Sequence, residues 1–333
     1  MQTKRGRIAH MEEHMRSGYK TLAAALAVGL ATAFIANDAN ADTKYRIAYL
    51  ARSQRDSFAA WLANSIVKEA QKYPDITLTV FDGQSKNEIM QTLIENAVQN
   101  KFDLTIIQPN DPPIQLGPVQ DAIKEGMKFV VTNPKFDDDT IPYVDANPYQ
   151  QGGENAKLGL KQIPQNAQVV VLMGPPGNPH SEGRRTAWQK EFFDKRPDVK
   201  ILDTQVASWN KDEAMRHTED WIQAHPQIDA VISMNDNMAA GAIEAIKAAG
   251  GKIHPLVYGV DGTAEACLLI KDGAMTSTTL QNANELAVRS VKMAHDILTG
   301  GNPDTHQMIQ AKLYTKDNVD ECIDLHKSIG DIK

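Results

Sequence analysis

Hydrogen-bonding side chains recur along the chain, each group directly after a short apolar run. Arg52, Asn133 and Asp261 stand in three of these places, and an aromatic residue, Trp209, stands in a fourth. Carboxylates accept hydrogen bonds, guanidinium groups donate them and amides do both, so such a set can hold a small polar molecule. Further polar segments of this kind are residues 108–111, 174–178, 234–236 and 281–282.

A simpler explanation exists for each of these residues taken alone. Loops between strands and helices are polar in general, and Asn and Asp often cap the first turn of a helix. The recurrence of such residues after so many apolar runs favours a shared ligand site.

The sequence carries none of the local motifs that would indicate catalysis. No G-x-G-x-x-G opens a helix, no phosphate-binding Walker loop, H-E-x-x-H or G-x-S-x-G occurs, and the nine His lack metal-ligand spacing. Asp261, Arg184 and His180 could transfer protons, but a set that binds hydroxyl groups in their ground state needs no chemistry. We expect no enzyme, no cofactor and no metal.

Apolar β-branched runs alternate with amphipathic segments, and this alternation must position the polar residues. Continuous apolar strands alternating with helices predict parallel sheets covered on both faces, and in such sheets ligands bind beyond the carboxyl ends of the strands. The pattern runs to residue 132 and restarts after residue 147, so we expect two doubly wound α/β lobes. The expected strands are 45–50, 77–81, 104–107, 128–132, 169–173, 201–206, 230–233, 256–260 and 275–279, and the expected helices are 58–72, 88–99, 115–125, 182–193, 211–225, 238–249, 265–272 and 284–298.

The N-terminus has the order of a secretory signal peptide. Basic residues precede an uncharged run, residues 21–35, and Ala39-Asn40-Ala41 fits a small-x-small cleavage site. The run is short for a transmembrane anchor, which needs about 20 residues. We expect residues 1–41 to be removed after Ala41 and the mature protein to lie in the periplasm.

The net charge limits the classes of binding partner, and the cysteine content limits the possible cross-links. Without residues 1–41 the chain keeps 30 basic and 39 acidic side chains, a net charge of −9, so we expect no nucleic-acid partner and no anionic membrane surface. Cys267 and Cys322 are the two cysteines of the chain. In an oxidising compartment they can form a disulfide, or they can stay two buried thiols.

Several segments together resemble the periplasmic sugar-binding proteins of the ribose- and galactose-binding type. The segment Gly174-Pro175-Pro176-Gly177-Asn178 continuing to Arg184 resembles a second-lobe loop of that family. The run Asn235-Asp236-Asn237-Met238-Ala239-Ala240-Gly241-Ala242 is close to its NDxMAxGA pattern, and Tyr258–Thr263 and Thr278–Ala283 resemble later strand ends. The likeness covers residues 44–315.

The resemblance implies the fold, the lobes and the site. The fold is the type I periplasmic binding protein, two parallel-sheet lobes joined by a three-segment hinge, with residues 42–146 and 282–308 in the N-terminal lobe and 147–281 and 309–333 in the C-terminal lobe. By matched position the ligand contacts are Arg52, Phe58, Asn133, Asn178, His180, Arg184, Trp209, Asn235, Asp261 and Gln281. Trp61 and Trp188 are expected to pack in the core.

The expected ligand is a monosaccharide or a related polyol or sugar acid, because Arg52, Asn133, Asn178 and His180 depart from one or other familiar pocket. The expected partner is the membrane permease of an ATP-binding-cassette (ABC) importer, and we expect a monomer. A chemoreceptor or sensor kinase is the alternative partner. A DNA-binding repressor of the same fold would carry a basic helix-turn-helix head where this chain has its apolar run.

Overall fold

The computed structural model describes residues 44–333. The predicted signal peptide and its cleavage after Ala41 lie outside these residues. Among residues 44–333, no helix combines the length and the apolar character that crossing a membrane would require.

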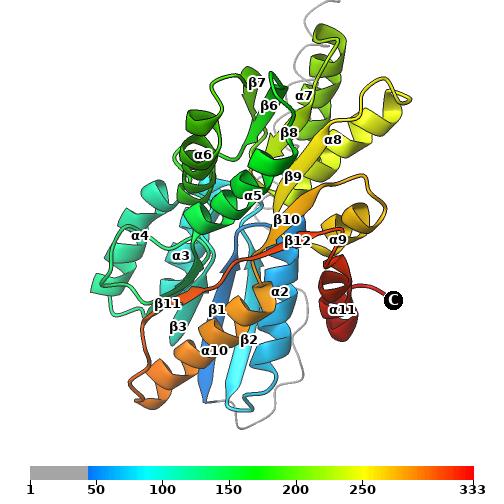
Figure 1. Cartoon of the computed structure of the whole chain (residues 1–333). Helices are drawn as coiled ribbons and strands as arrows, with labels where there is room; N and C mark the ends of the chain where they lie inside the picture. Colours follow the sequence, from blue (N-terminus) through cyan, green and yellow to red (C-terminus); the bar gives the residue numbers. More distant parts are fainter. Residues whose placement is uncertain (1–43) are drawn as a thin grey trace, which may run out of the picture. The chain divides into compact units, whose positions relative to one another are not determined.

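A six-stranded sheet forms the first lobe, in the order β11-β5-β4-β3-β1-β2. Its strands β11, β3, β1 and β2 are labelled in Figure 1. All of its neighbouring strands run parallel. Its strands are β1 (Tyr45–Ala51), β2 (Ile76–Asp82), β3 (Leu104–Ile107), β4 (Phe129–Thr132), β5 (Tyr143–Ala146) and β11 (His306–Ile309), and its helices are α2 (Ser57–Ala70), α3 (Asn87–Gln99), α4 (Pro112–Lys124) and α10 (Ala283–Thr299).

A second six-stranded sheet forms the other lobe, in the order β12-β10-β9-β8-β6-β7. Its strands are β6 (Gln168–Met173), β7 (Lys200–Val206), β8 (Ala230–Ser233), β9 (Leu256–Asp261), β10 (Ser277–Leu280) and β12 (Lys312–Thr315). Its helices are α5 (Pro148–Gln162), α6 (Pro179–Glu191), the short 3₁₀ helix η1 (Phe193–Lys195), α7 (Lys211–Ala224), α8 (Asp236–Ala248), α9 (Ala264–Lys271) and α11 (Val319–Ile329).

The predicted parallel pairing holds in the second sheet except at one edge, where the unpredicted strand β12 pairs antiparallel with β10. The physical reason is the connection that precedes β12. Strand β11 runs parallel to β5 in the first sheet, and only residues 310–311 separate it from β12 in the second. A link this short cannot reverse the chain through a crossover helix, so β12 keeps the direction in which it arrives.

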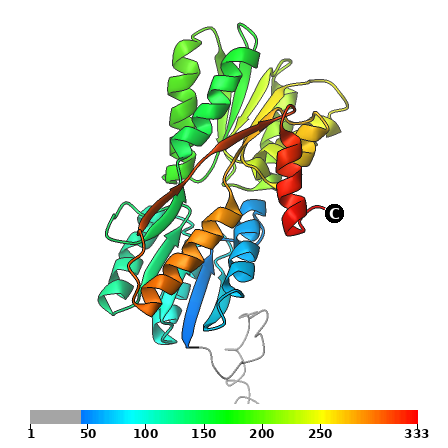
Figure 2. The same ribbon diagram turned by 60° about the horizontal axis from the view of Figure 1, so that its bottom comes forward.

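The chain passes between the two sheets three times. It leaves the first sheet after β5, returns to it from β10 through α10, and leaves it again from β11 to β12 (Figure 2). Three connections between two lobes are the arrangement of a hinged molecule.

Strand β1 shows how the sequence builds a sheet with two covered faces. Ile47 and Tyr49 pack in one core with residues of α2 and α10, whereas Ala48 and Leu50 pack in a second core with residues of α3 and α4. Successive side chains of a strand point to opposite faces, and all four are fully buried, so the run has to be continuously apolar.

Candidate ligand-binding site

A cavity between the two lobes is lined by all ten residues that the sequence predicts as ligand contacts. Asp261 is the last residue of β9 and Arg184 lies within α6, and the other eight come from loops or helix starts that follow the carboxyl end of a strand, as expected for doubly wound sheets. Pro134, which was not predicted, also lines the cavity. Arg52, Phe58 and Asn133 come from the first lobe, Asn178, His180, Arg184, Trp209, Asn235 and Asp261 come from the second, and Gln281 stands between β10 and α10.

Arg184 is the central donor of the cavity. Its Nε donates to Gln151 Oε1 at 3.0 Å and its Nη1 to the Met234 carbonyl at 2.7 Å. Its Nη2 donates to Gln281 Oε1 at 3.0 Å and lies 3.4 Å from Asp261 Oδ1. Burial lowers the pKa of Arg184 and the neighbouring Asp261 raises it. These contacts from α5, the loop between β8 and α8, β9 and the connection between β10 and α10 fix the guanidinium group in one position.

Asp261 ends β9 and is 2% exposed. Burial raises the pKa of its carboxyl well above the usual range, while the positive charge of Arg184 opposes this shift. Gln281 Nε2 also lies 3.4 Å from Asp261 Oδ1. A carboxylate this buried requires hydrogen-bond donors, and the hydroxyl groups of a bound solute would supply more of them.

His180 connects the two lobes through Asp145. Its Nε2 lies 2.9 Å from Asp145 Oδ1, and its Nδ1 lies 3.4 Å from Arg184 Nη2. Because Arg184 can only donate, Nδ1 accepts, and the proton of the neutral ring is on Nε2. Asp145 belongs to β5 of the first lobe and also lies 3.4 Å from Asn133 Nδ2.

Trp209 lies between the two cationic side chains of the cavity. Its ring centre is 5.9 Å from the guanidinium carbon of Arg52 and 5.8 Å from that of Arg184. The ring rests on Gly174, where a Cβ atom would come within 2.3 Å of the indole. The glycine therefore lets the ring approach the strand end closely, and the ring both packs in the hydrophobic core and lines the cavity.

Arg52 forms an ion pair with Asp56 at 3.0 Å, and both side chains are buried. Arg52 was predicted as a ligand contact, and in the structure its charge is already paired with that of Asp56. Asp56 also caps α2 by accepting from Ala59 N at 2.8 Å.

Asn178 combines the two roles that the sequence left open. Its Oδ1 accepts from His180 N at 3.0 Å and caps α6. Its Nδ2 is buried and has no hydrogen-bond partner among residues 44–333. Arg52 Nε and Trp209 Nε1 are also buried and have no hydrogen-bond partner within that part of the chain. Three lining residues thus present unused donors, which a solute with several oxygens would satisfy.

The site also contains residues that the sequence reasoning missed. Asp56, Asp145 and Gln151 hold Arg52, His180 and Arg184 respectively. The four-residue spacing of Arg52 and Asp56 just before a helix was an available signal in the sequence.

Asp236 is a further buried acidic residue near the site. Its carboxyl group accepts from Thr278 Oγ1 at 2.6 Å and from Thr263 N at 2.9 Å, and burial raises its pKa to about 6.

Comparison with known proteins places the chain in a family. The family model described as "Periplasmic binding protein domain" matches residues 47–302. A xylitol-binding protein of Mycolicibacterium smegmatis is 28% identical over 316 residues, covering 91% of this chain and 87% of the relative.

Two solved structures with bound solutes share the fold. An ABC transporter solute-binding protein of Bacillus halodurans with bound myo-inositol has a TM-score of 0.76 at 26% identity, covering 85% of this chain and 98% of that one. A periplasmic solute-binding protein of Actinobacillus succinogenes with bound D-allose has a TM-score of 0.75 at 26% identity, covering 84% and 100%.

Proposed function

Because the chain belongs to the periplasmic binding protein family, we propose that it binds an uncharged polyol or monosaccharide in the interlobe cavity and delivers it to the permease of an ABC importer. The single observation that carries this proposal is the cavity itself, whose lining comes from both lobes and presents unused buried donors. A solute that touches both lobes has different affinities for their open and closed arrangements, and this difference favours closure.

The pairing of charges supports an uncharged ligand over a sugar acid. Arg52 lies against Asp56 and Arg184 against Asp261. A carboxylate entering the cavity would lose its hydration and meet no cation free of an acidic partner among the described lining residues. Hydroxyl groups both donate and accept, so they fit donors such as Trp209 Nε1 and acceptors such as Asp261.

The relatives support the same class of ligand. Xylitol, myo-inositol and D-allose stand in the descriptions of three of them, and all three molecules are uncharged and carry several hydroxyl groups. We propose that the protein binds the solute without converting it, because side chains complementary to hydroxyl groups serve binding alone and require no reaction of the solute.

Several narrower points belong to the same proposal. We propose export to the periplasm with cleavage after Ala41, a monomer in solution, and lobes made of residues 42–146 with 282–308 and 147–281 with 309–333. The strand membership of the two sheets supports these lobe boundaries.

A thermal-shift panel tests the function. Xylitol, myo-inositol, D-allose and ribose are added to the mature protein, with xylonate and gluconate as charged counterparts. A ligand at 100 times its Kd stabilises the folded state by about 2.7 kcal/mol, so at least one uncharged compound should raise the Tm by several degrees. No shift with any uncharged compound, or a shift with the acids alone, would refute the proposal.

A further inference from the structure

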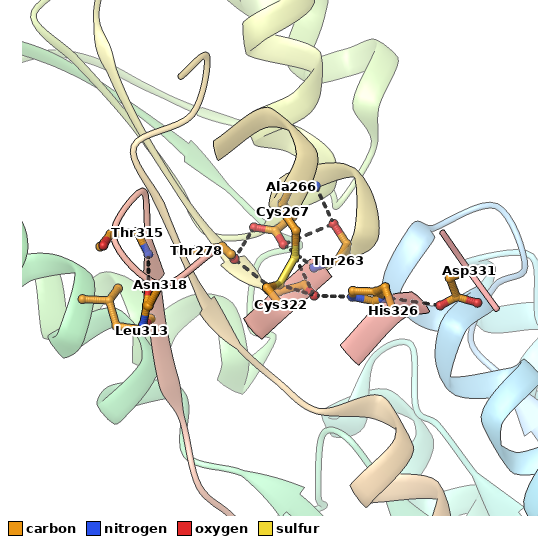
Figure 3. Close-up of a disulfide and its surroundings, with 12 residues drawn as sticks. Thr263, Ala266, Cys267, Thr278, Leu313, Thr315, Asn318, Cys322, His326 and Asp331 are labelled. Atoms are coloured by element: carbon orange, nitrogen blue, oxygen red, sulfur yellow. Dashed lines mark hydrogen bonds and ion pairs between the residues drawn. A yellow bond between two sulfur atoms is a disulfide. The ribbon is translucent and has the colours of Figure 1, made fainter. Parts of the chain in front are cut away.

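A disulfide lies beside the turn that follows β9, close to the backbone of Gly262 (Figure 3). It joins Cys267 of α9 to Cys322 of α11, across a sequence separation of 55 residues, with the two Cα atoms 5.9 Å apart. Both residues are fully buried. The disulfide therefore fixes the C-terminal helix α11 to the helix that follows β9.

The backbone carbonyl of Gly262, the residue next to Asp261, is where the surrounding side chains converge. His326 of α11 donates from Nε2 to this carbonyl oxygen at 2.8 Å, and the two sulfur atoms lie 3.8 Å from it. A closed disulfide has no S–H group, so His326 supplies the side-chain hydrogen bond and the sulfurs supply packing. On the other side of the same residue, Gly262 N donates to Thr278 Oγ1 at 3.0 Å.

The backbone at this turn needs such support. Asp261 has a φ of 126° and Gly262 a φ of 70°. A non-glycine residue is rare in this region, and it persists there only where its surroundings hold it in place. The carboxyl group of Asp261 projects from the adjoining backbone, so bonds that hold Gly262 also restrain the backbone that carries this carboxyl group.

Helix α11 also contacts the other lobe. The His326 ring lies 4.6 Å from the ring of Trp61 in α2, and Lys68 Nζ of α2 donates to the Ile329 carbonyl at 2.6 Å. Helix α2 carries Phe58, which lines the cavity. Helix α11, which lies outside the cavity, thus contacts both the turn next to Asp261 in the second lobe and helix α2, which carries Phe58, in the first lobe.

The structure assigns His326, anchored by the Cys267–Cys322 disulfide, as a positioning residue that sets ligand affinity by holding the backbone of Asp261. The inference rests on the proposed function. His326 is not among the residues that line the cavity and acts through the Gly262 carbonyl. Its Nδ1 lies 3.1 Å from Asp331 Oδ2, which holds the other side of the ring.

The cluster could also be considered as a metal site, because ligand atoms of Cys267, Cys322 and His326 lie within 4.8 Å of one another. A thiolate is the form of cysteine that binds metals. The closed disulfide has no thiolate, and both ring nitrogens of His326 already face an oxygen. The support of Asp261 is the role that these contacts favour.

The test separates the hydrogen bond from the packing of the ring. His326→Phe keeps an aromatic ring against Trp61 but removes the donor, whereas His326→Gln keeps an N–H donor. Dissociation constants for xylitol, myo-inositol and D-allose are measured by titration calorimetry in the mature protein, and hydrogen exchange of the Gly262 amide is measured without ligand.

We expect His326→Phe to raise the Kd by about fivefold to tenfold and His326→Gln to restore most of the affinity, as for one lost hydrogen bond. Exchange at Gly262 should be faster in the Phe variant. The Cys267→Ser/Cys322→Ser double variant, and the wild-type chain under reductant, should also bind more weakly.

Trp221→Phe is the matched control, because this buried aromatic of α7 loses its bond to Asp203 far from the turn. It should lower the Tm with the Kd unchanged. If His326→Phe behaves like this control, the positioning role is wrong while the binding function stands. If the wild-type chain binds none of the three probes, the proposed function fails, and this inference fails with it.

Discussion

At the scale of single residues, the cavity depends on buried charges that are held by one another. Arg184 uses its donors on Gln151, the Met234 carbonyl, Gln281 and Asp261. Arg184 therefore uses its N–H groups mainly to hold these protein acceptors in place and not to bind the ligand directly. Removing it would leave Asp261 buried without its counter-charge.

Arg184→Ala should therefore weaken solute binding by more than tenfold, as expected when one partner of a buried, hydrogen-bonded charge pair is truncated. Titration calorimetry measures the change. Arg185→Ala is the matched control, because this neighbour on α6 binds Gln189 and does not line the cavity. Equal affinity of the two variants would contradict the site.

Asp236 gives a pH prediction. Its pKa is raised from 3.8 to about 6 by burial. Between pH 3.8 and about pH 6 the carboxyl group of Asp236 is protonated in the folded state and ionised in the unfolded state. Its contribution to the free energy of unfolding is therefore fully present below pH 3.8 and is lost as the pH rises through about 6.

The free energy of unfolding of the wild type minus that of Asp236→Asn should accordingly fall by about 2 kcal/mol between pH 4 and pH 7 and stay constant above. Urea denaturation at several pH values in the ligand-free protein measures this difference. A difference that rises with pH would mean that Asp236 is ionised at low pH in the folded state, contrary to the burial argument.

At the scale of elements, the sequence predicted most of the two sheets and missed β5, α5, β11, β12 and α11. The missed strands are four residues long, and β5 includes the buried charge of Asp145, so no apolar run marks them. Helix α5 begins Pro148-Tyr149-Gln150-Gln151-Gly152, which has little helical periodicity. Its Gly152 is required because a Cβ there would meet the Arg184 carbonyl at 2.5 Å.

The candidate site was easier to predict than its supports. All ten proposed contacts line the cavity because they follow strands whose carboxyl ends share an edge. Asp145, Gln151 and His326 were missed because they lie on the elements that periodicity did not reveal. Their contacts join residues 35, 33 and 64 positions apart, and only the tertiary fold brings these together.

The disulfide carries a stability prediction at this scale. Reducing it, or replacing Cys267 and Cys322 by Ser, should lower the free energy of unfolding by about 2–4 kcal/mol, because the unfolded chain loses the constraint on a 55-residue loop. Urea denaturation with and without reductant measures the loss. The double variant serves as the control and should not respond to reductant, since the chain has no other cysteine.

At the scale of the whole molecule, two lobes connected by three crossings share one cavity. The His180–Asp145 bond and the Trp61–His326 contact join the lobes at separate places. A solute that adds contacts to both lobes should shift an equilibrium between open and closed arrangements toward the closed one.

Small-angle X-ray scattering tests this closure. Saturating myo-inositol, xylitol or D-allose should reduce the radius of gyration of the wild-type chain, whichever of the three binds. Arg184→Ala at the same solute concentration should change less, because less of it is bound. A radius that stays constant while calorimetry shows saturation would mean that binding leaves the lobes where they are.

The central claim is that the interlobe cavity holds an uncharged, hydroxyl-rich solute, and a crystal structure of the complex tests it most directly. We predict solute oxygens within about 3 Å of Arg52 Nε, Asn178 Nδ2 and Trp209 Nε1, which are the buried donors of the cavity lining that lack a partner within residues 44–333. Solute bound outside this cavity, or bound within it through a carboxylate on Arg52 with Asp56 displaced, would contradict the account.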